Sequence, residues 1–165
     1  RGGKTLGIIG FGRMGQALGR MAKGIGMNVI AQDIYHVPDI EEEMGMKYVE
    51  LDELFAQADF ISLHTPSLNG VKLICKENID KMKDGVVFIN TSRGDNVNED
   101  DLLEALNSGK IRAAGLDVYA VEPPANAALI NHPNVSCTPH IGAATKEAQK
   151  RIGMEIVDII ESFGK

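Results

Sequence analysis

Hydrophobic and polar positions along this chain repeat with two different periods. Short, nearly continuous apolar runs predict buried strands, and they fall at residues 4–10, 27–33, 59–66, 85–92, 112–119 and 134–139. Between these runs an apolar residue recurs at every third or fourth position, as in an amphipathic helix, at residues 12–24, 51–58, 76–82, 98–110 and 145–162. The alternation predicts a single α/β domain, a doubly wound and mainly parallel sheet with helices on both faces.

A glycine-rich loop follows the first predicted strand. The stretch "GFGRMG" places Gly10, Gly12 and Gly15 in a G-x-G-x-x-G pattern, and Asp33 ends the next strand. A strand before the loop and a helix opening within it are typical of the Rossmann-type dinucleotide-binding site. Gly10 would allow the tight turn, Gly12 the approach of the pyrophosphate, and Gly15 the packing of helix on strand. Asp33 would accept hydrogen bonds from the ribose and repel a 2′-phosphate, which favours NAD over NADP.

Polar residues come directly after several predicted strands. Because the carboxyl ends of parallel strands share one rim of the sheet, where such folds bind their ligands, we expect these side chains to lie close together. They are His64, Thr65, Thr91, Ser92, Arg93, Asp117, Glu122 and His140.

Three residues of this set suit the oxidation of an alcohol. His140 could act as the base for a hydroxyl proton, and a nearby carboxylate such as Glu122 would stabilise its protonated form. The Arg93 guanidinium could hold an anionic substrate through its fork of donors. Plainer roles remain open: His140 as a cap of the sheet, Arg93 in a surface ion pair, Glu122 as a solvated loop carboxylate. His64 could belong either to the core or to the site.

Arg93 also begins the tripeptide Arg-Gly-Asp, which adhesive proteins display to receptors. Such a role needs an exposed loop of a secreted protein, whereas Arg93 follows the buried run "VVFIN". Cys75 and Cys137 form neither a disulfide framework nor a metal-ligand spacing, so we expect reduced cysteines, a cytoplasmic protein and no metal. The tripeptide is therefore interpreted as a coincidence, and Arg93 as the anchor of the substrate.

The overall composition argues against a nucleic-acid-binding protein and against a membrane-spanning one. The chain has 165 residues, a formal net charge of −6 and 44% hydrophobic residues. An acidic chain offers no basic field for nucleic acid, and no apolar run reaches the roughly 18 residues of a membrane span. The chain begins with Arg1 rather than Met, so we expect it to be a piece of a longer protein.

Nearly the whole chain resembles the NAD-dependent D-2-hydroxyacid dehydrogenase family. The resemblance rests on "KTLGIIGFGRMGQ", "HTP", "FINTSRGDNVNEDDLLEALNSGKIRAAGLDVYAVEPP" and "TPHIGAATKEAQKR". It implies that residues 1–165 form the NAD-binding domain and that the domain that closes over the substrate is absent from this chain. The segment 66–74 is shorter than in the family and lacks its threonines.

The resemblance also assigns roles to individual residues. It implies that Arg93 binds the carboxylate and the reacting oxygen of the substrate, and that His140 is the acid/base with Glu122 as its partner. It implies that Asp117 faces the nicotinamide end with Gly142 beside it. The remaining residues that it implies in cofactor binding are the backbone N–H groups of Arg13 and Met14 at the pyrophosphate, and Thr65, Pro66, Thr91, Ser92 and Arg93 along the cleft.

The ending "HIGAATKEAQ" is most similar to the phosphoglycerate dehydrogenase branch of the family. This implies hydride transfer between 3-phospho-D-glycerate and NAD in serine biosynthesis, by a homodimer or tetramer of the full-length protein. The isolated domain is expected to bind NAD but to turn over poorly, since closure completes such sites. The alternatives are a glycerate, formate or lactate dehydrogenase, or a corepressor that senses NAD(H) on the same scaffold.

Overall fold

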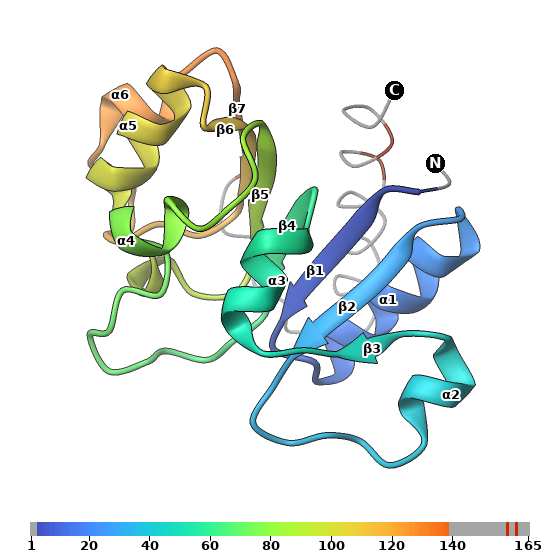
Figure 1. The fold of residues 1–165 in the computed structure, drawn as a ribbon. Coiled ribbons are helices and arrows are strands. Elements are labelled where there is room, and N and C mark those ends of the chain that lie inside the picture. Colours follow the sequence, from blue (N-terminus) through green and yellow to red (C-terminus); the bar gives the residue numbers. More distant parts are fainter. Residues whose placement is uncertain (1–2, 139–157, 159–160, 162–165) are drawn as a thin grey trace.

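The fold is a twisted parallel sheet between two layers of helices (Figure 1). The computed structural model describes residues 3–138, together with Asp158 and Glu161. Within that part the sheet has seven strands in the order β3-β2-β1-β4-β5-β6-β7, and every neighbouring pair is parallel. The strands are β1 (Thr5–Ile9), β2 (Asn28–Gln32), β3 (Lys47–Tyr48), β4 (Phe60–Leu63), β5 (Val86–Asn90), β6 (Ile111–Leu116) and β7 (Val135–Cys137).

The chain winds outward in both directions from β1, and this makes the sheet doubly wound. One face is covered by α1 (Arg13–Gly24) and α2 (Ile40–Met44). The other is covered by α3 (Leu51–Gln57), α4 (Lys76–Ile79), α5 (Glu99–Ser108) and α6 (Ala127–Ile130). The predicted fold class is confirmed. The order reverses between β1 and β4, where open sheets of this kind form their ligand crevice.

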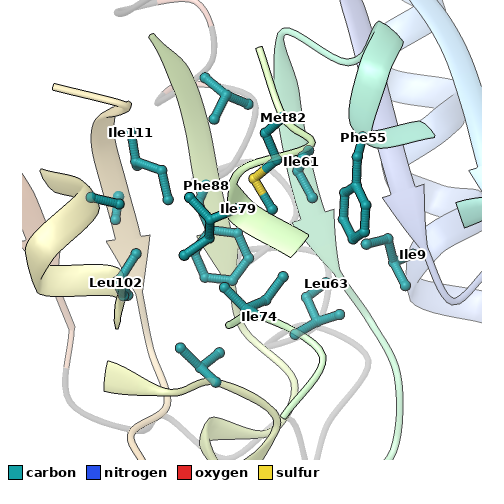
Figure 2. Close-up of a cluster of buried hydrophobic side chains, with 14 of the residues drawn as sticks. Ile9, Phe55, Ile61, Leu63, Ile74, Ile79, Met82, Phe88, Leu102 and Ile111 are labelled. Carbon is teal, nitrogen blue, oxygen red and sulfur yellow. The ribbon is translucent and has the colours of Figure 1, made fainter. Parts of the chain in front are cut away.

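The larger cluster of buried side chains lies between the sheet and α3 to α5 (Figure 2). Phe88 from β5 and Ile61 from β4 meet Phe55 from α3 and Leu102 from α5 there. All five residues of β5 are buried, because helices or loops cover both faces of this central strand. The central strands thus form a rigid base for the loops that follow them.

Helix α5 begins and ends where its sequence predicts. The side chain of Asn98 accepts a hydrogen bond from the Asp101 backbone N–H at 3.1 Å. Three acidic residues occupy its first turn, and Gly109 ends the helix with a φ of +82°, the left-handed conformation that favours glycine.

Short elements escaped the sequence analysis. Helix α2, strand β3 and helix α6 span five, two and four residues, which is too short for a hydrophobic period to become visible. Helix α4 ends at Ile79, earlier than the predicted residue 82. The helix predicted at 145–162 lies outside the described residues, except that Asp158 and Glu161 are helical.

The described residues include no helix that combines the length and the apolar character needed to cross a bilayer.

Candidate functional site

The glycine loop connects β1 to α1 at the reversal of the strand order. Gly10 has a φ of +89°, and a Cβ on it would lie 2.6 Å from the backbone oxygen of His64. A Cβ on Gly15 would lie 2.4 Å from the oxygen of Gly10. Both contacts are too short for a real side chain, so the turn and the close packing of helix on strand require glycine at these positions.

Gly12 differs from these two glycines, because apart from its chain neighbours a Cβ there would meet no atom of the described residues within 4 Å. It is exposed and lies at the N-cap of α1, where no side chain caps the helix. The first N–H groups of a helix have no partner within it, and those of Arg13 and Met14 belong to this first turn. The loop therefore presents an open approach to uncapped N–H groups, which suits an anion.

Asp33 lies beside this loop at the end of β2. Its Oδ2 accepts a hydrogen bond from the Phe11 backbone N–H at 2.7 Å, and its Oδ1 accepts one from the Tyr35 N–H at 3.3 Å. The carboxylate therefore holds the glycine loop in place. A carboxylate has about four acceptor sites, so half-buried Asp33 keeps capacity for the hydroxyl groups of a ligand.

His64, Thr65 and Pro66 follow β4 on the same rim. The Nε2 atom of His64 lies 2.7 Å from Oγ of Ser62, a fully buried residue of β4. Burial lowers the pKa of His64 from its ordinary value to about 4, so the imidazole is neutral near pH 7. His64 therefore belongs both to the core and to the rim, because it pairs with a core serine and is itself half-buried.

The loop after β5 contains Thr91, Ser92 and Arg93. The buried amide of Asn90 accepts hydrogen bonds from the Ser92 N–H and Oγ, both at 3.1 Å, and donates one to the Arg93 oxygen at 3.1 Å. The side chain of Arg93 is exposed. Within the described residues, Oγ1 of Thr91 is the buried side-chain polar atom without a hydrogen-bond partner, so its capacity for a hydrogen bond is unused.

Gly94 brings the Arg93 loop against the loop after β6. A Cβ on Gly94 would lie 2.0 Å from the backbone carbon and oxygen of Tyr119. The glycine of "RGD" is therefore needed for this contact between two backbones. Its φ is not in the left-handed region.

An open cavity of about 330 Å³ lies where these two loops meet. Arg93 and Glu122 both line it, with Ser92 and Tyr119. Arg93 and Glu122, which were predicted as catalytic residues from separate parts of the sequence, thus line the same cavity.

The loop that carries Glu122 is fixed from three sides. Oε2 of Glu99 accepts a hydrogen bond from the Ala120 N–H at 2.7 Å. Asp117 is buried and accepts a hydrogen bond from Oγ1 of Thr138 at 2.5 Å. The Tyr119 hydroxyl donates to the backbone oxygen of Thr138 at 2.8 Å. Burial, followed by the neighbouring Cys137, raises the pKa of Tyr119.

Two predicted site residues, His140 and Gly142, lie outside the described residues. The chain is described as far as Thr138, which is tied to Asp117 and Tyr119. The other predicted residues lie on the same rim of the sheet, at the ends of β1, β2, β4, β5 and β6.

Of the buried polar groups that shape this rim, Asp117 was predicted from the sequence, whereas Ser62, Asn90 and Asn96 were not. In the part of the chain that the structure describes, the buried polar or charged residues are Ser62, Asn90, Asn96 and Asp117. All four lie on β4, β5 or β6 or in the loops that follow those strands. One signal was available, because Asn90 is a polar residue that ends an apolar strand in the same way as His64 follows one.

The sequence and the fold are similar to those of known proteins. The sequence model of the family "D-isomer specific 2-hydroxyacid dehydrogenase, NAD binding domain" matches residues 1–142. The chain is 48% identical over 162 residues to a hydroxypyruvate reductase from Thermotoga maritima, covering 96% of this chain and 52% of that protein. It is 44% identical over 160 residues to D-3-phosphoglycerate dehydrogenase 2, chloroplastic, from Arabidopsis thaliana, covering 96% of this chain and 26% of that protein.

A solved structure of a glyoxylate reductase from Paecilomyes thermophila superimposes with a TM-score of 0.81 at 42% identity, covering 98% of this chain and 49% of that one. The chain therefore spans about half the length of this protein and of the bacterial reductase. With its doubly wound parallel sheet and a glycine loop at the reversal of strand order, the chain belongs to the NAD-binding domain family of the D-isomer-specific 2-hydroxyacid dehydrogenases.

Proposed function

We propose that this chain is the NAD-binding part of an enzyme that transfers a hydride between NAD and a small D-2-hydroxy acid. The observation that supports this most is the cavity lined by both Arg93 and Glu122. A cation and a carboxylate in one open hollow suit an anionic substrate and an acid/base step.

The residues around the glycine loop fit NAD. The uncapped start of α1 would take the pyrophosphate, and Asp33 would accept from the ribose. The unpartnered Oγ1 of Thr91 offers a hydrogen bond to a bound cofactor. We place His64, Thr65, Pro66, Ser92, Asp117 and Gly142 along the same cleft, as the family resemblance implies.

When bound, NAD supplies the acceptor or donor of the hydride. The side chains of this chain would perform the remaining work. Arg93 would hold the substrate carboxylate with two parallel hydrogen bonds and polarise the neighbouring oxygen. During oxidation His140 would take the hydroxyl proton, and Glu122 would stabilise the protonated imidazole. The loop bonds of Asn90 and Glu99 would keep Arg93 and Glu122 in position.

We further propose that the chain works together with a substrate-binding domain that closes over the cavity and excludes water. The relatives are about twice as long as this chain or longer, which supports the proposal. On its own the chain is expected to bind NAD and to turn over poorly. The complete protein is expected to be a cytoplasmic homodimer or tetramer.

The substrate is proposed as a class, with two leading members. The ending "HIGAATKEAQ" favours 3-phospho-D-glycerate and a place in serine biosynthesis, and relatives of 41–45% identity are named D-3-phosphoglycerate dehydrogenase. Two relatives of 48% and 49% identity are named hydroxypyruvate reductase, which favours D-glycerate. Both substrates carry the 2-hydroxy carboxylate that Arg93 would hold.

A substrate panel tests this function. The complete protein is assayed with NAD and NADP against 3-phosphoglycerate, D-glycerate, glycolate and D-lactate, and the assay is repeated with Arg93→Ala and His140→Ala. Turnover of at least one acid that falls by about two orders of magnitude or more in both variants is expected. Wild-type protein that binds NADH but oxidises none of these acids would contradict the enzymatic role and favour an NAD(H)-sensing corepressor.

A further inference from the structure

Asn96 is a buried polar residue that the proposed chemistry does not use. Its side chain is fully buried and lies in the 3₁₀ turn Gly94–Asn96, directly after Arg93. A buried amide is costly unless its hydrogen bonds are satisfied. Its partners therefore indicate what the residue is for.

All three side-chain hydrogen bonds of Asn96 go to the segment 65–68, roughly thirty residues earlier in the chain. Nδ2 donates to Oγ1 of Thr65 at 3.0 Å and to the backbone oxygen of Pro66 at 2.9 Å. Oδ1 accepts from the Leu68 N–H at 3.0 Å. Both amide protons and the amide oxygen are thus engaged with the segment that begins the cofactor cleft.

Other bonds hold the same two pieces of chain together. The Ile74 N–H donates to the backbone oxygen of Asn96 at 3.1 Å, and the Asn98 N–H donates to the oxygen of Ile74 at 2.8 Å. At the surface, Oγ of Ser67 donates to Asp95 at 2.5 Å. The segment 65–74 and the turn after Arg93 are therefore joined along their length, with Asn96 at the buried centre.

Arg93 is fixed on its other side. Asn90 donates to the Arg93 oxygen at 3.1 Å, and Gly94 contacts the backbone of Tyr119. The 3₁₀ turn is therefore held by Asn90 of β5 and by the loop after β6 on one side, and by the segment 65–68 on the other. A shift of the turn would be expected to displace Arg93 or the segment 65–68.

We propose that Asn96 is a positioning residue that fixes the Thr65–Leu68 cofactor segment and the Arg93 loop relative to each other. The inference rests on the proposed function, because it takes Thr65 as a cofactor contact and Arg93 as the substrate anchor. Asn96 itself is fully buried and would contact neither ligand. Its replacement should weaken the binding of both.

The test substitutes Asn96→Ser in the complete protein. The dissociation constant of NADH by calorimetry and the KM of the 2-hydroxy acid at saturating NAD are each expected to rise about tenfold, since small misplacements of binding groups carry costs of this order. Thr65→Val is combined with Asn96→Ser in a double-mutant cycle on NADH affinity. The two effects should be less than additive, because both variants break the same bond.

The matched control is Asp59→Asn. Oδ2 of Asp59 accepts from the Thr5 N–H at 2.9 Å and Oδ1 pairs with Nζ of Lys83 at 3.2 Å, at the amino end of the strands. The variant removes the charge and so weakens both interactions at the opposite edge of the sheet. It should lower thermal stability without changing either ligand constant.

The possible outcomes distinguish a failure of the proposed function from a failure of the positioning role of Asn96. If the wild-type protein neither binds NADH nor turns over a 2-hydroxy acid, the proposed function is wrong. An active wild type whose Asn96→Ser variant keeps either the NADH constant or the substrate KM unchanged would overturn the positioning role. The same holds if Asn96→Ser only loses stability, as Asp59→Asn does.

Discussion

The two loops that face the proposed cofactor are built in opposite ways. The glycine loop after β1 depends on missing side chains, since a Cβ on Gly10 or Gly15 would collide with backbone. The Arg93 loop after β5 depends on buried side chains, the amides of Asn90 and Asn96. The glycine loop is thus shaped mainly by the absence of side chains and the Arg93 loop mainly by buried hydrogen bonds, although Gly94 of the Arg93 loop also requires the absence of a side chain.

This difference has a physical reason. A pyrophosphate is bound mainly by backbone N–H groups, so its loop has to bring main chain close to the ligand. A substrate carboxylate is bound by a long side chain that can adopt many rotamers. Its loop must therefore hold the base of Arg93 firmly, and buried amides do this with directional bonds.

The largest effect is expected at Gly94, where the Arg93 loop also depends on a missing side chain. Gly94→Ala places a Cβ 2.0 Å from backbone atoms of Tyr119, so backbone must move. We expect a loss of about 3 kcal/mol or more in the free energy of unfolding, measured by urea denaturation. Gly12→Ala is the matched variant, because apart from its chain neighbours its Cβ meets no atom within 4 Å in the part of the chain that the structure describes. It should keep stability within about 1 kcal/mol but bind NADH more weakly. Equal stability of the two variants would contradict the comparison.

Asn90→Ala tests the hydrogen-bonded loop directly. The substitution leaves the Ser92 N–H and the Arg93 oxygen without their partner. A loss of about 2 kcal/mol in stability is expected, and the KM of the 2-hydroxy acid should rise more than that of NAD. A similar rise in both constants would mean that Asn90 supports the whole rim rather than the Arg93 loop. Unfolding curves and steady-state kinetics of the same preparation give both answers.

His64 lies between the two loops and predicts a dependence on pH. Its pKa is about 4 in the folded protein and 6.5 for an imidazole exposed to water, so the unfolded chain binds the extra proton between these values. Stability is therefore complete above about pH 6.5 and falls as the pH drops toward 4, by about 1–3 kcal/mol. His64→Gln should flatten this part of the curve of unfolding free energy against pH. His132→Gln, which alters a histidine paired with Asn107, serves as the control, and an unchanged slope in His64→Gln would refute the assignment.

The smallest effect is expected at Asp33, where a side chain supports the glycine loop. Asp33→Ser removes the charge that would repel a 2′-phosphate, so the preference for NADH over NADPH should fall about tenfold. The variant also loses the bond from the Phe11 N–H, which should weaken NADH binding itself. Calorimetry with both cofactors measures the two changes. Asp39→Asn removes a nearby exposed charge and should leave the preference as it is.

The sequence predicted the glycine loop more completely than the Arg93 loop, for the same physical reason. Gly10, Gly12, Gly15 and Asp33 follow a local pattern in which each residue type has its own role. The partners of Asn96 lie roughly thirty residues away. No local pattern in residues 65–68 predicts that they bond to Asn96. The close contact of Gly94 with Tyr119 is equally distant in sequence.

The strands other than β3 were predicted because burial on two faces leaves continuous apolar runs, as in β5. Helices α1 and α5 were predicted because each is long enough for its apolar period to be visible. The short elements α2, β3 and α6 were missed because packing, and not their own period, makes them regular.

The aromatic residues described above also give the molecule an internal optical readout. The chain has no tryptophan and three tyrosines, and Tyr35 is exposed. Tyr48 packs edge-on against Phe11 of the glycine loop, whereas Tyr119 lines the cavity with Arg93. Near-ultraviolet circular dichroism of this chain should therefore be dominated by two rings, one for each loop. Single Tyr→Phe variants would separate the signals and follow the two halves of the crevice independently during titration with ligand.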